Sequence, residues 1–594
     1  MNEKTFRRVL ANPVTRRSFL GGAGALAGLV VATQMPDRAW GQVASGSPFT
    51  LGVASGDPLP DGVVLWTRLA TDPLNASGTG GMPQRNIPIR WEVARDAAMT
   101  QIVQSGTVLA LAQDAHSVHV ELSGLESATL YFYRFRSGAF VSPVGRTKTA
   151  PAFNAPTDLF RFAFVSCSDY QNGFFAAYQR LAEEVTRGDL DLVVHLGDYL
   201  YEYDPISTTE AAAIGGRQHN TNPAPPAGQV RLDTEQLQFL ADYRLRHAQY
   251  KTDPSLQEAH RLYPWVTVWD DHEIENNHAN DIDEITDDPL VTPAQFLLQR
   301  AAAYKAYYEH MPLRRTSLPS GANMQLYRRL RFGNLAEFHM LDTRQYRTDQ
   351  PVDRSTGIGF VLSNSDFRPG LPANGNPTGT LTGAEQEAWL LEGLAASTAT
   401  WNVLGNQVMM AQFNYGKFIP PASGGNIIYN VDQWDGYGAN RQRILNAMNT
   451  LRGPNKNFVV ITGDIHSAWV HDLKANYADP DNPGDTVGTE LVCSSVTADF
   501  PIGFIAPVSA AATPTQTPWT KYFNGAQKGY VVCTLTPTQW FTDFRYVETA
   551  LVPGATPAQS SFKVTSATAP VVPGSNGQPT SWVVQSGVPG AVPV

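Results

Sequence analysis

The sequence predicts an α/β fold preceded by a small all-β domain, and three observations support this prediction. The chain has 594 residues, which is long enough for two or more domains. Between about residues 48 and 150, short segments alternate apolar with polar residues and turn residues separate them, as in a β-sandwich. From Leu159 onward, apolar strand-like runs alternate with segments of helical periodicity. We therefore expect a β-sandwich at 48–150 and a larger α/β domain at 159–550.

The all-β domain is predicted from four segments whose alternating side chains would face opposite sides of a sheet. These segments are residues 63–68, 89–93, 117–122 and 130–136. A stretch rich in Pro and Ala at 149–157 is expected to link this domain to the next one. We expect the domain to serve packing or to face carbohydrate, without chemistry of its own.

Helical spacing of apolar residues appears at 174–185, 292–310 and 382–396 in the larger domain. The third of these helices is expected to begin with a capping box formed by Thr382 and Glu385. Residues 551–594 are dominated by Pro, Gly, Ser, Thr, Ala and Val, so we expect a loosely packed C-terminal tail.

Residues 1–41 resemble a twin-arginine signal peptide. Arg16 and Arg17 precede Phe19 and Leu20, and the mildly apolar run that follows is short for a membrane span. The alternative is an uncleaved amphipathic anchor. The signal predicts export to the periplasm or the extracellular space, with the twin-arginine translocase as a transient partner. No second hydrophobic stretch is long enough to form a stable membrane span.

The charge of the chain limits its partners. The net charge is −10, and because residues 1–41 carry +4, the remainder carries about −14. This balance argues against binding nucleic acid or an anionic membrane through bulk charge. It does not exclude phosphate-bearing substrates, because bound cations can set the local field.

The most informative motif follows the apolar run at 192–194. Asp198 stands where this predicted strand ends, and Tyr201 follows three residues later. A carboxylate at a strand end can bridge two metal ions, and a phenolate three residues on can reach ferric iron. The alternative is an ordinary Gly-Asp turn.

Three other predicted strands end in similar residues. One ends at Cys167, a second in the cluster from Asp270 to Glu273, and a third at Asp464 and His466. Each motif also has a structural alternative. Cys167 could be an inert buried thiol, the Asp270–Glu273 cluster a solvated loop with a helix cap, and His466 a lone buried histidine. Adjacent carboxylates repel and call for cations, and Asp464 and His466 can face one side of a strand. Because sites in layered α/β folds gather at the carboxyl ends of strands, we expect one metal site.

The order of these motifs resembles the calcineurin-like metallophosphoesterase superfamily, and most closely the PhoD-like alkaline phosphatase family. The similarity runs from about residue 49 to about residue 547. The segments that carry it are residues 166–168, 195–202, 269–273, 341–347 and 462–467.

This resemblance implies a four-layer α/β/β/α metallophosphoesterase sandwich for the larger domain. It also implies a ferric ion (Fe3+) and calcium (Ca2+), with Asp198 bridging the two metals. The implied iron ligands are Cys167, Asp198, Tyr201 and His466. The implied calcium ligands are Asp271 and Asp464, whose carboxylates favour a hard, oxygen-seeking ion, while Asp270 either holds a further calcium or caps a turn.

Paired cations can hold phosphate oxygens and lower the pKa of a water molecule. His272 is then placed to protonate the leaving oxygen, or else it orients Asp271. Arg344 could steady phosphate with its planar fork, or else form a structural ion pair with Asp342 or a neighbour. The side chain of Asn406 is expected to be a carbonyl ligand or a tie to the backbone.

The predicted function is that of a secreted, metal-dependent phosphohydrolase, an alkaline phosphatase or phosphodiesterase acting on phosphate mono- or diesters. Small molecules, phospholipids and wall polymers are all possible substrates. The alternatives are a secreted phospholipase D-type phosphodiesterase, a non-heme iron oxidoreductase and a non-catalytic cell-wall-binding protein. Three cysteines cannot form a disulfide framework, and Cys493 and Cys533 either pair or remain free.

Overall fold

The computed structural model describes residues 46–594 apart from eight internal gaps. These gaps are residues 234–235, 284–290, 352–359, 362–377, 416–428, 478–484, 513–516 and 553–559. The predicted signal peptide, residues 1–41, lies outside the described residues.

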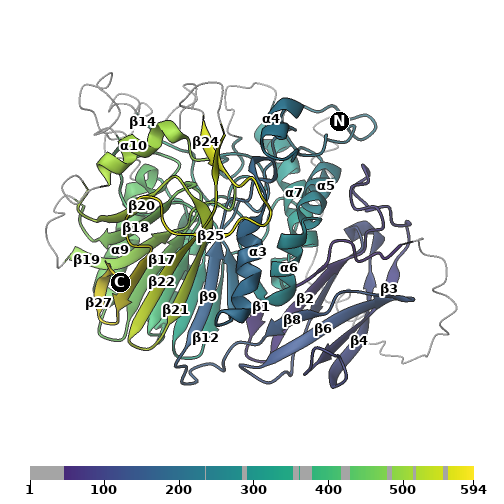
Figure 1. The fold of residues 1–594 in the computed structure, drawn as a ribbon, viewed down its shortest axis with the longest axis horizontal. Helices are drawn as coiled ribbons and strands as arrows, with labels where there is room; N and C mark the ends of the chain where they lie inside the picture. Colours follow the sequence, from purple (N-terminus) through teal and green to yellow (C-terminus); the bar gives the residue numbers. More distant parts are fainter. Residues whose placement is uncertain are drawn as a thin grey trace. The chain divides into compact units, whose positions relative to one another are not determined.

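The N-terminal region is a two-sheet β-sandwich (Figure 1). Its separate sheet is antiparallel, in the order β4-β3-β6-β7 with β8 beside β6. The strands of this sheet are β3 (Ile87–Ala94), β4 (Ile102–Ala110), β6 (Leu130–Ser137), β7 (Phe140–Val141) and β8 (Gly145–Lys148).

The second sheet of the sandwich is not separate from the larger domain. Strand β1 (Val53–Leu59) pairs with β2 (Gly62–Arg68), which in turn pairs with β5 (Ser117–Glu121). On its other edge, β1 pairs in parallel with β11 (Pro264–Thr267) of the larger domain. The expected β-sandwich is therefore present, but one of its two sheets continues into the α/β domain.

Two sheets form the centre of the larger domain. In the first, an 11-stranded sheet, β11 follows two parallel strands, β9 (Phe160–Val165) and β10 (Leu192–His195). The opposite edge of β9 pairs with β21 (Lys528–Leu535), which pairs with β22 (Gln539–Val547).

The second sheet has seven strands in the order β12-β13-β15-β17-β19-β18-β20. Strands β13, β15, β17 and β19 are mutually parallel. The strands are β12 (Arg328–Phe332), β13 (Ala336–Met340), β15 (Trp401–Gly405), β17 (Asn457–Thr462), β18 (Ala468–Lys474), β19 (Thr486–Val492) and β20 (Thr520–Asn524).

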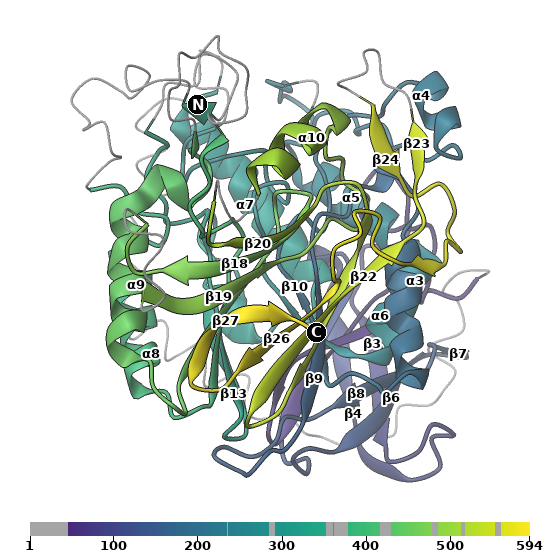
Figure 2. The ribbon, with the colours of Figure 1, turned by 60° about the vertical axis from the view of Figure 1, so that its left-hand side comes forward.

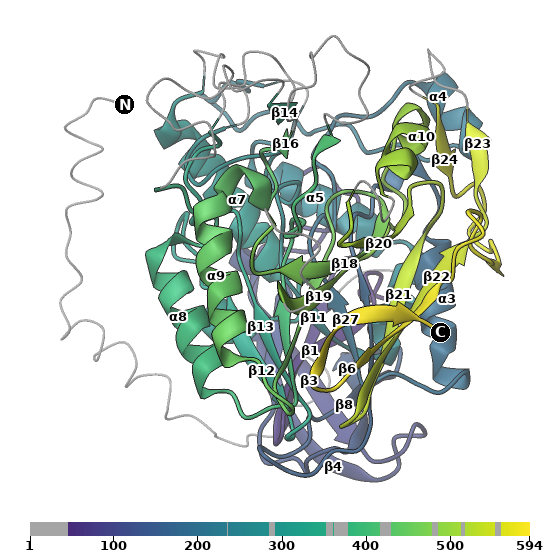
Figure 3. The same ribbon diagram turned by 90° about the vertical axis from the view of Figure 1, so that its left-hand side faces the viewer.

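Helices cover the outer faces of both sheets, which gives the expected four layers. Figure 3 shows α8 and α9 on one side and α3 on the other, with strands between them. The helices are α3 (Ala176–Ala182), α5 (Leu240–Lys251), α6 (Pro254–Leu262), α7 (Pro293–His310), α8 (Gly383–Ala396) and α9 (Gly438–Leu451). Among the helices of the described ranges, none combines the length and the apolar character that crossing a bilayer requires.

The helix predictions were correct except for one cap. A capping box begins α7, where Thr292 and Gln295 bond reciprocally. The capping box predicted for α8 is wrong, because Thr382 has no capping hydrogen bond there. Its hydroxyl instead donates to Oδ1 of Asn440 on α9, at 3.3 Å, so a tertiary contact displaced the local one.

Aromatic side chains fill the space between the two sheets. Phe162 of β9 is 0% exposed and packs edge-on against Phe338 of the second sheet, with ring centroids 5.1 Å apart. The same ring lies 5.6 Å from Trp540 of β22. Along β17, Val459 and Ile461 belong to this core, while Phe458 and Val460 pack with the α8 and α9 side, as strand alternation requires.

The expectation of a loosely packed C-terminal tail was wrong. Two of its strands, β26 (Ser581–Gln585) and β27 (Val588–Pro593), extend the large sheet beyond β22 (Figure 2). Trp582 and Val584 of β26 are buried. The Pro-rich composition was misleading because proline is tolerated in edge strands and loops, where no ladder hydrogen bond is lost.

We expect Phe162→Ala to lower the free energy of unfolding by about 3–5 kcal/mol, because the change leaves a cavity between the sheets. Urea denaturation followed by circular dichroism measures this loss. Phe153→Ala is the matched control, since that ring is 62% exposed and its removal should change stability by less than about 0.5 kcal/mol. Equal losses for both variants would contradict the assigned core.

Candidate metal centre

The side chains predicted to bind metal converge at the carboxyl ends of four strands. Cys167 follows β9, Asp198 follows β10, and Asp270 and Asp271 follow β11, all in the first sheet. The fourth motif follows β17 of the second sheet, so the facing sheets bring it to the same place.

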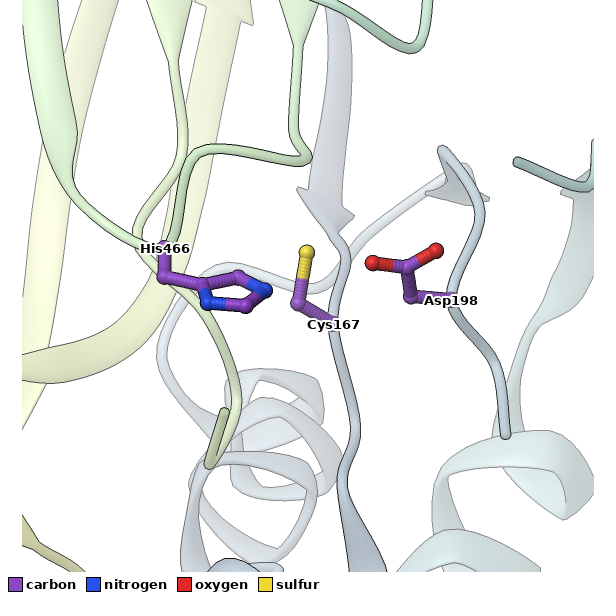
Figure 4. A group of neighbouring side chains, drawn as sticks. All are labelled: Cys167, Asp198 and His466. Atoms are coloured by element: carbon purple, nitrogen blue, oxygen red, sulfur yellow. The ribbon is translucent and has the colours of Figure 1, made fainter. Parts of the chain in front are cut away.

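Three groups of side chains hold ligand atoms within 4.8 Å of one another. Asp198 belongs to two of the groups and Asp271 to two, so the groups form one continuous cluster. Figure 4 shows the thiol of Cys167 between the imidazole of His466 and the carboxylate of Asp198. The groups are Cys167 with Asp198 and His466, Asp198 with Asp271 and His272, and Asp270 with Asp271 and Asp464.

Tyr201 completes the first group. Its hydroxyl donates to Oδ2 of Asp198 at 3.1 Å and lies 2.9 Å from Nε2 of His466. Nδ1 of His466 donates to the backbone oxygen of Asp499 at 2.7 Å, because a carbonyl can only accept. This bond fixes the tautomer and leaves Nε2 with a lone pair directed at the group. Burial also lowers the pKa of His466 to about 3, so the ring is neutral.

Strained backbone holds four of these residues. Cys167, Asp198, Asp464 and His466 have φ angles of 61°, 53°, 63° and 55°, in the left-handed region that non-glycine residues rarely adopt. Each such residue costs on the order of 1–3 kcal/mol and persists only where the surrounding structure imposes it. The strain places four candidate ligands of three types, a thiol, two carboxylates and an imidazole, on short turns directly after strands.

Two glycines let these turns approach each other closely. A Cβ at Gly197 would lie 2.5 Å from Cβ of Asp270, and one at Gly463 would lie 2.4 Å from Oγ of Ser166. Both distances are too short for real atoms. The two Gly-Asp pairs therefore lie in turns. The first position of each turn must be glycine, because any side chain there would keep the loops of the site apart.

Glu273 ties the loops after β10 and β11 together. Its carboxylate accepts backbone N–H bonds from Asp198, Tyr199 and Asp270 at 3.0, 2.6 and 2.9 Å. The motif that contains Glu273 was recognised in the sequence, but this role was missed, because hydrogen bonds to a distant backbone leave no sequence pattern.

His272 forms a dyad with Glu202. Nδ1 of the ring lies 2.7 Å from Oε2 of Glu202, which also accepts the backbone N–H of Asn276 at 2.8 Å through its other oxygen. Burial acts to lower the pKa of His272, but the charges of Glu202, Asp271 and Asp198 raise it well above its usual value. The backbone N–H of His272 also donates to Asp271 at 2.9 Å.

Arg344 is fully buried and pairs with carboxylates rather than facing a cleft. It donates to Asp270 through Nε and to both oxygens of Asp432 at 2.9 and 2.8 Å. It also lies 3.5 Å from Asp271 and 3.4 Å from Asp464. Arg344 therefore forms the structural ion pair considered above, but its partners are other carboxylates than Asp342. The hydrogen bond between Arg344 and Asp342 comes from the backbone N–H of Arg344 and not from its guanidinium. No feature of the sequence indicated Asp432.

The cluster holds more negative charge than its protein partners compensate. Oδ1 of Asp198 and Oδ2 of Asp270 are buried and have no hydrogen-bond partner among the described residues. Burial and neighbouring carboxylates raise the pKa of both groups well above the usual value. Burial likewise raises the pKa of Asp464 to about 6. The pKa of Asp271 is lowered, because Arg344 and His272 together outweigh its burial.

These features fit metal ions. Unpartnered buried oxygens and a neutral imidazole are what bound cations need. Burial raises the pKa values of the Cys167 thiol and the Tyr201 phenol well above their usual range, so these groups are protonated unless a cation is bound.

The structure shows the state of the two other cysteines and the role of Asn406. Cys493 and Cys533 are both buried free thiols and do not pair. The side chain of Asn406 is a backbone tie rather than a ligand, since its amide donates to the carbonyl of Val408 and its oxygen accepts from Trp434 at 3.2 Å.

Comparison with known proteins agrees with this fold and these motifs. Residues 162–544 match the family model described as "PhoD-like phosphatase", and residues 34–151 match "PhoD-like phosphatase, N-terminal domain". Alkaline phosphatase D of Bacillus subtilis (strain 168) is 43% identical over 562 residues, which cover 93% of this chain and 88% of that protein.

A solved structure described as "Structure of PhoD" superposes with a TM-score of 0.77 at 42% identity, and the match covers 93% of each chain. The expected layered α/β fold with an N-terminal β domain is therefore confirmed. Since the larger family model alone spans more than half of the sequence, the chain belongs to the PhoD-like phosphatase family.

Proposed function

We propose that this protein is a metal-dependent phosphoric ester hydrolase of the alkaline phosphatase D type. The observation that carries the proposal is the continuous cluster in which Asp198 and Asp271 are each shared between neighbouring ligand groups. Shared carboxylates suit two ions held side by side, the arrangement that many phosphatases use. The 43% identity to an alkaline phosphatase D over 93% of the chain supports the same reaction.

The donor types suggest two different metals. Cys167, Tyr201 and His466 offer sulfur, phenolate and imidazole ligands, and with Asp198 they suit ferric iron. The all-carboxylate group of Asp270, Asp271 and Asp464 suits calcium, which prefers oxygen ligands. Asp198 would then serve both ions.

When bound, the metal ions would stabilise charge on the phosphoryl oxygens and lower the pKa of the attacking water. The protein's own groups supply position and protons. Glu202 holds the proton on Nδ1 of His272, which leaves Nε2 to deliver a proton to the leaving oxygen. The Tyr201 ring lies with its centroid 4.0 Å from that of His272 and limits rotation of the imidazole.

Arg344 has a positioning role in this proposal. Its guanidinium neutralises part of the carboxylate cluster and is held in place by an ion pair with Asp432. Asp432 also accepts a hydrogen bond from Arg347 at 2.6 Å. Because both Nη atoms of Arg344 donate to Asp432, the side chain orients Asp270 and Asp464 rather than holding phosphate.

We also propose that the protein is exported by the twin-arginine pathway, which carries folded proteins, so that the metals are loaded before export. Arg16 and Arg17 in the N-terminal segment support this proposal. Cell fractionation of a chain in which both arginines are replaced by lysine tests it.

The central test removes the shared ligand. The purified protein should contain about one iron per chain together with calcium, and Asp198→Ala should lose both metals. Hydrolysis of p-nitrophenyl phosphate should fall by at least about a thousandfold, since metal ions supply several kcal/mol of transition-state stabilisation. Elemental analysis and kcat/KM measure the two effects.

The control for this test is Asp96→Ala, which removes a partly exposed carboxylate from a turn of the N-terminal domain, far in sequence from the cluster. It should leave metals and activity unchanged. Zinc as the only metal, or loss of calcium alone from Asp198→Ala, would contradict the proposed ligand assignment.

His272→Gln should slow esters with poor alkoxide leaving groups far more than p-nitrophenyl phosphate, because a good leaving group needs little protonation. General acid catalysis contributes roughly 10²–10⁴-fold where it operates. Glu202→Gln should show the same selectivity to a smaller degree, since it removes the partner of the ring. Equal slowing of both ester types at full metal occupancy would remove His272 from the catalytic role.

Arg344→Met should lower the free energy of unfolding by about 3–5 kcal/mol, because it leaves Asp270 as a buried charge without an arginine and leaves Asp432 with only one of its two arginines. The double variant Arg344→Met with Asp432→Asn should recover part of this loss, as urea denaturation of the metal-free protein will measure. An unchanged stability, with only KM for substrate raised, would instead indicate a phosphate contact.

A further inference from the structure

The outer face of the five-stranded N-terminal sheet gathers three arginines around one carboxylate. In the strand register, Arg90 of β3 lies opposite Arg136 of β6, and Glu92 lies opposite Arg134. The Nε atoms of Arg90, Arg134 and Arg136 lie 3.2, 2.6 and 3.1 Å from the oxygens of Glu92. These contacts use Nε in every case, so the Nη groups of all three guanidiniums are not needed for them.

This arrangement holds more positive charge than the fold requires. One arginine would neutralise Glu92, and like charges directly opposite each other on neighbouring strands are destabilising. Nevertheless Arg90 and Arg136 stand directly opposite each other, with side chains 59% and 37% exposed. A net excess of two positive charges is therefore displayed to solvent by a chain whose total charge is −10.

Exposed aliphatic side chains flank the arginines on the same face. Val141 of β7 lies opposite Arg136 and is 42% exposed. Leu109 of β4 lies opposite Pro88, two residues from Arg90 and thus on its side of the sheet, and is 52% exposed. The inner face of β6 packs Tyr133 into the core, so Arg134 and Arg136 point to the opposite, outer face. On that outer face β8 contacts the larger domain through Arg146, and the three arginines around Glu92 lie on β3 and β6.

We propose that this face, defined by Arg90, Arg134, Arg136, Leu109 and Val141, docks the protein peripherally on an anionic phospholipid bilayer. Guanidinium groups pair with lipid phosphates, and neighbouring aliphatic side chains enter the interface between headgroups and acyl chains. The sheet lies at the margin of the N-terminal region in Figure 1. Because the rest of the chain is negative, attachment depends on this face and weakens as salt rises.

A soluble polyanion is the competing occupant. Such a polymer would need the arginines but would gain nothing from Leu109 and Val141, whereas a bilayer uses both. The combination of charge and exposed aliphatic surface therefore favours lipid.

The test is cosedimentation with vesicles of equal parts phosphatidylcholine and phosphatidylglycerol. Arg90→Gln with Arg136→Gln should weaken binding on the order of tenfold or more, while Arg134 remains to pair with Glu92. Leu109→Ser with Val141→Ser should also weaken it. The control, Arg187→Gln with Arg315→Gln, removes the same charge from other exposed positions and should bind as the unaltered protein does.

All these variants should hydrolyse p-nitrophenyl phosphate normally, and binding is measured without turnover, so failure of the proposed hydrolase activity would leave this test intact. Failure of the unaltered protein to sediment with anionic vesicles at low salt would overturn the proposal. Equal binding by the Arg90/Arg136 variant and its control would also overturn it. Loss through the arginines alone, with Leu109→Ser and Val141→Ser silent, would overturn the role of the two aliphatic side chains and with it the preference for a bilayer over a soluble polyanion.

Discussion

Burial of several carboxylates at one point is the constraint on which the rest of this structure depends. Asp198, Asp270, Asp271 and Asp464 approach one another from loops of two different sheets. Water relieves little of their mutual repulsion, because Asp198, Asp270 and Asp271 are only 1–2% exposed. Arg344 supplies one internal counter-charge, and the two unpartnered oxygens are left for cations.

The surrounding architecture opposes this repulsion mechanically. Strand ends fix the position of each loop, left-handed backbone turns the ligands inward, and Gly197 and Gly463 let the loops touch. Glu273 then binds three backbone N–H groups across two loops. The strained backbone and the buried carboxylates thus destabilise the fold locally at the site. Burial of the aromatic core between the sheets offsets this loss.

The N-terminal sandwich is mechanically part of the same body, since β1 pairs directly with β11, whose end carries Asp270 and Asp271. Because the two regions share a sheet, the position of the β-sandwich relative to the candidate metal centre is fixed by backbone hydrogen bonds between strands. In the separate five-stranded sheet, Arg90 and Arg136 are exposed to solvent, which leaves them available for a surface role distinct from the chemistry.

The sequence by itself determined the candidate metal-binding residues and their places at strand ends, because strand periodicity and turn residues are local. It also determined the extent of α7 through helical spacing, and the layered fold class through motifs that resemble a known family. Only the tertiary structure decided the partners of Arg344, the roles of Glu273 and Asp432, the free state of Cys493 and Cys533, and the ordered C-terminal strands. These features depend on contacts between residues far apart in the chain, and such contacts leave no local periodicity from which they can be read.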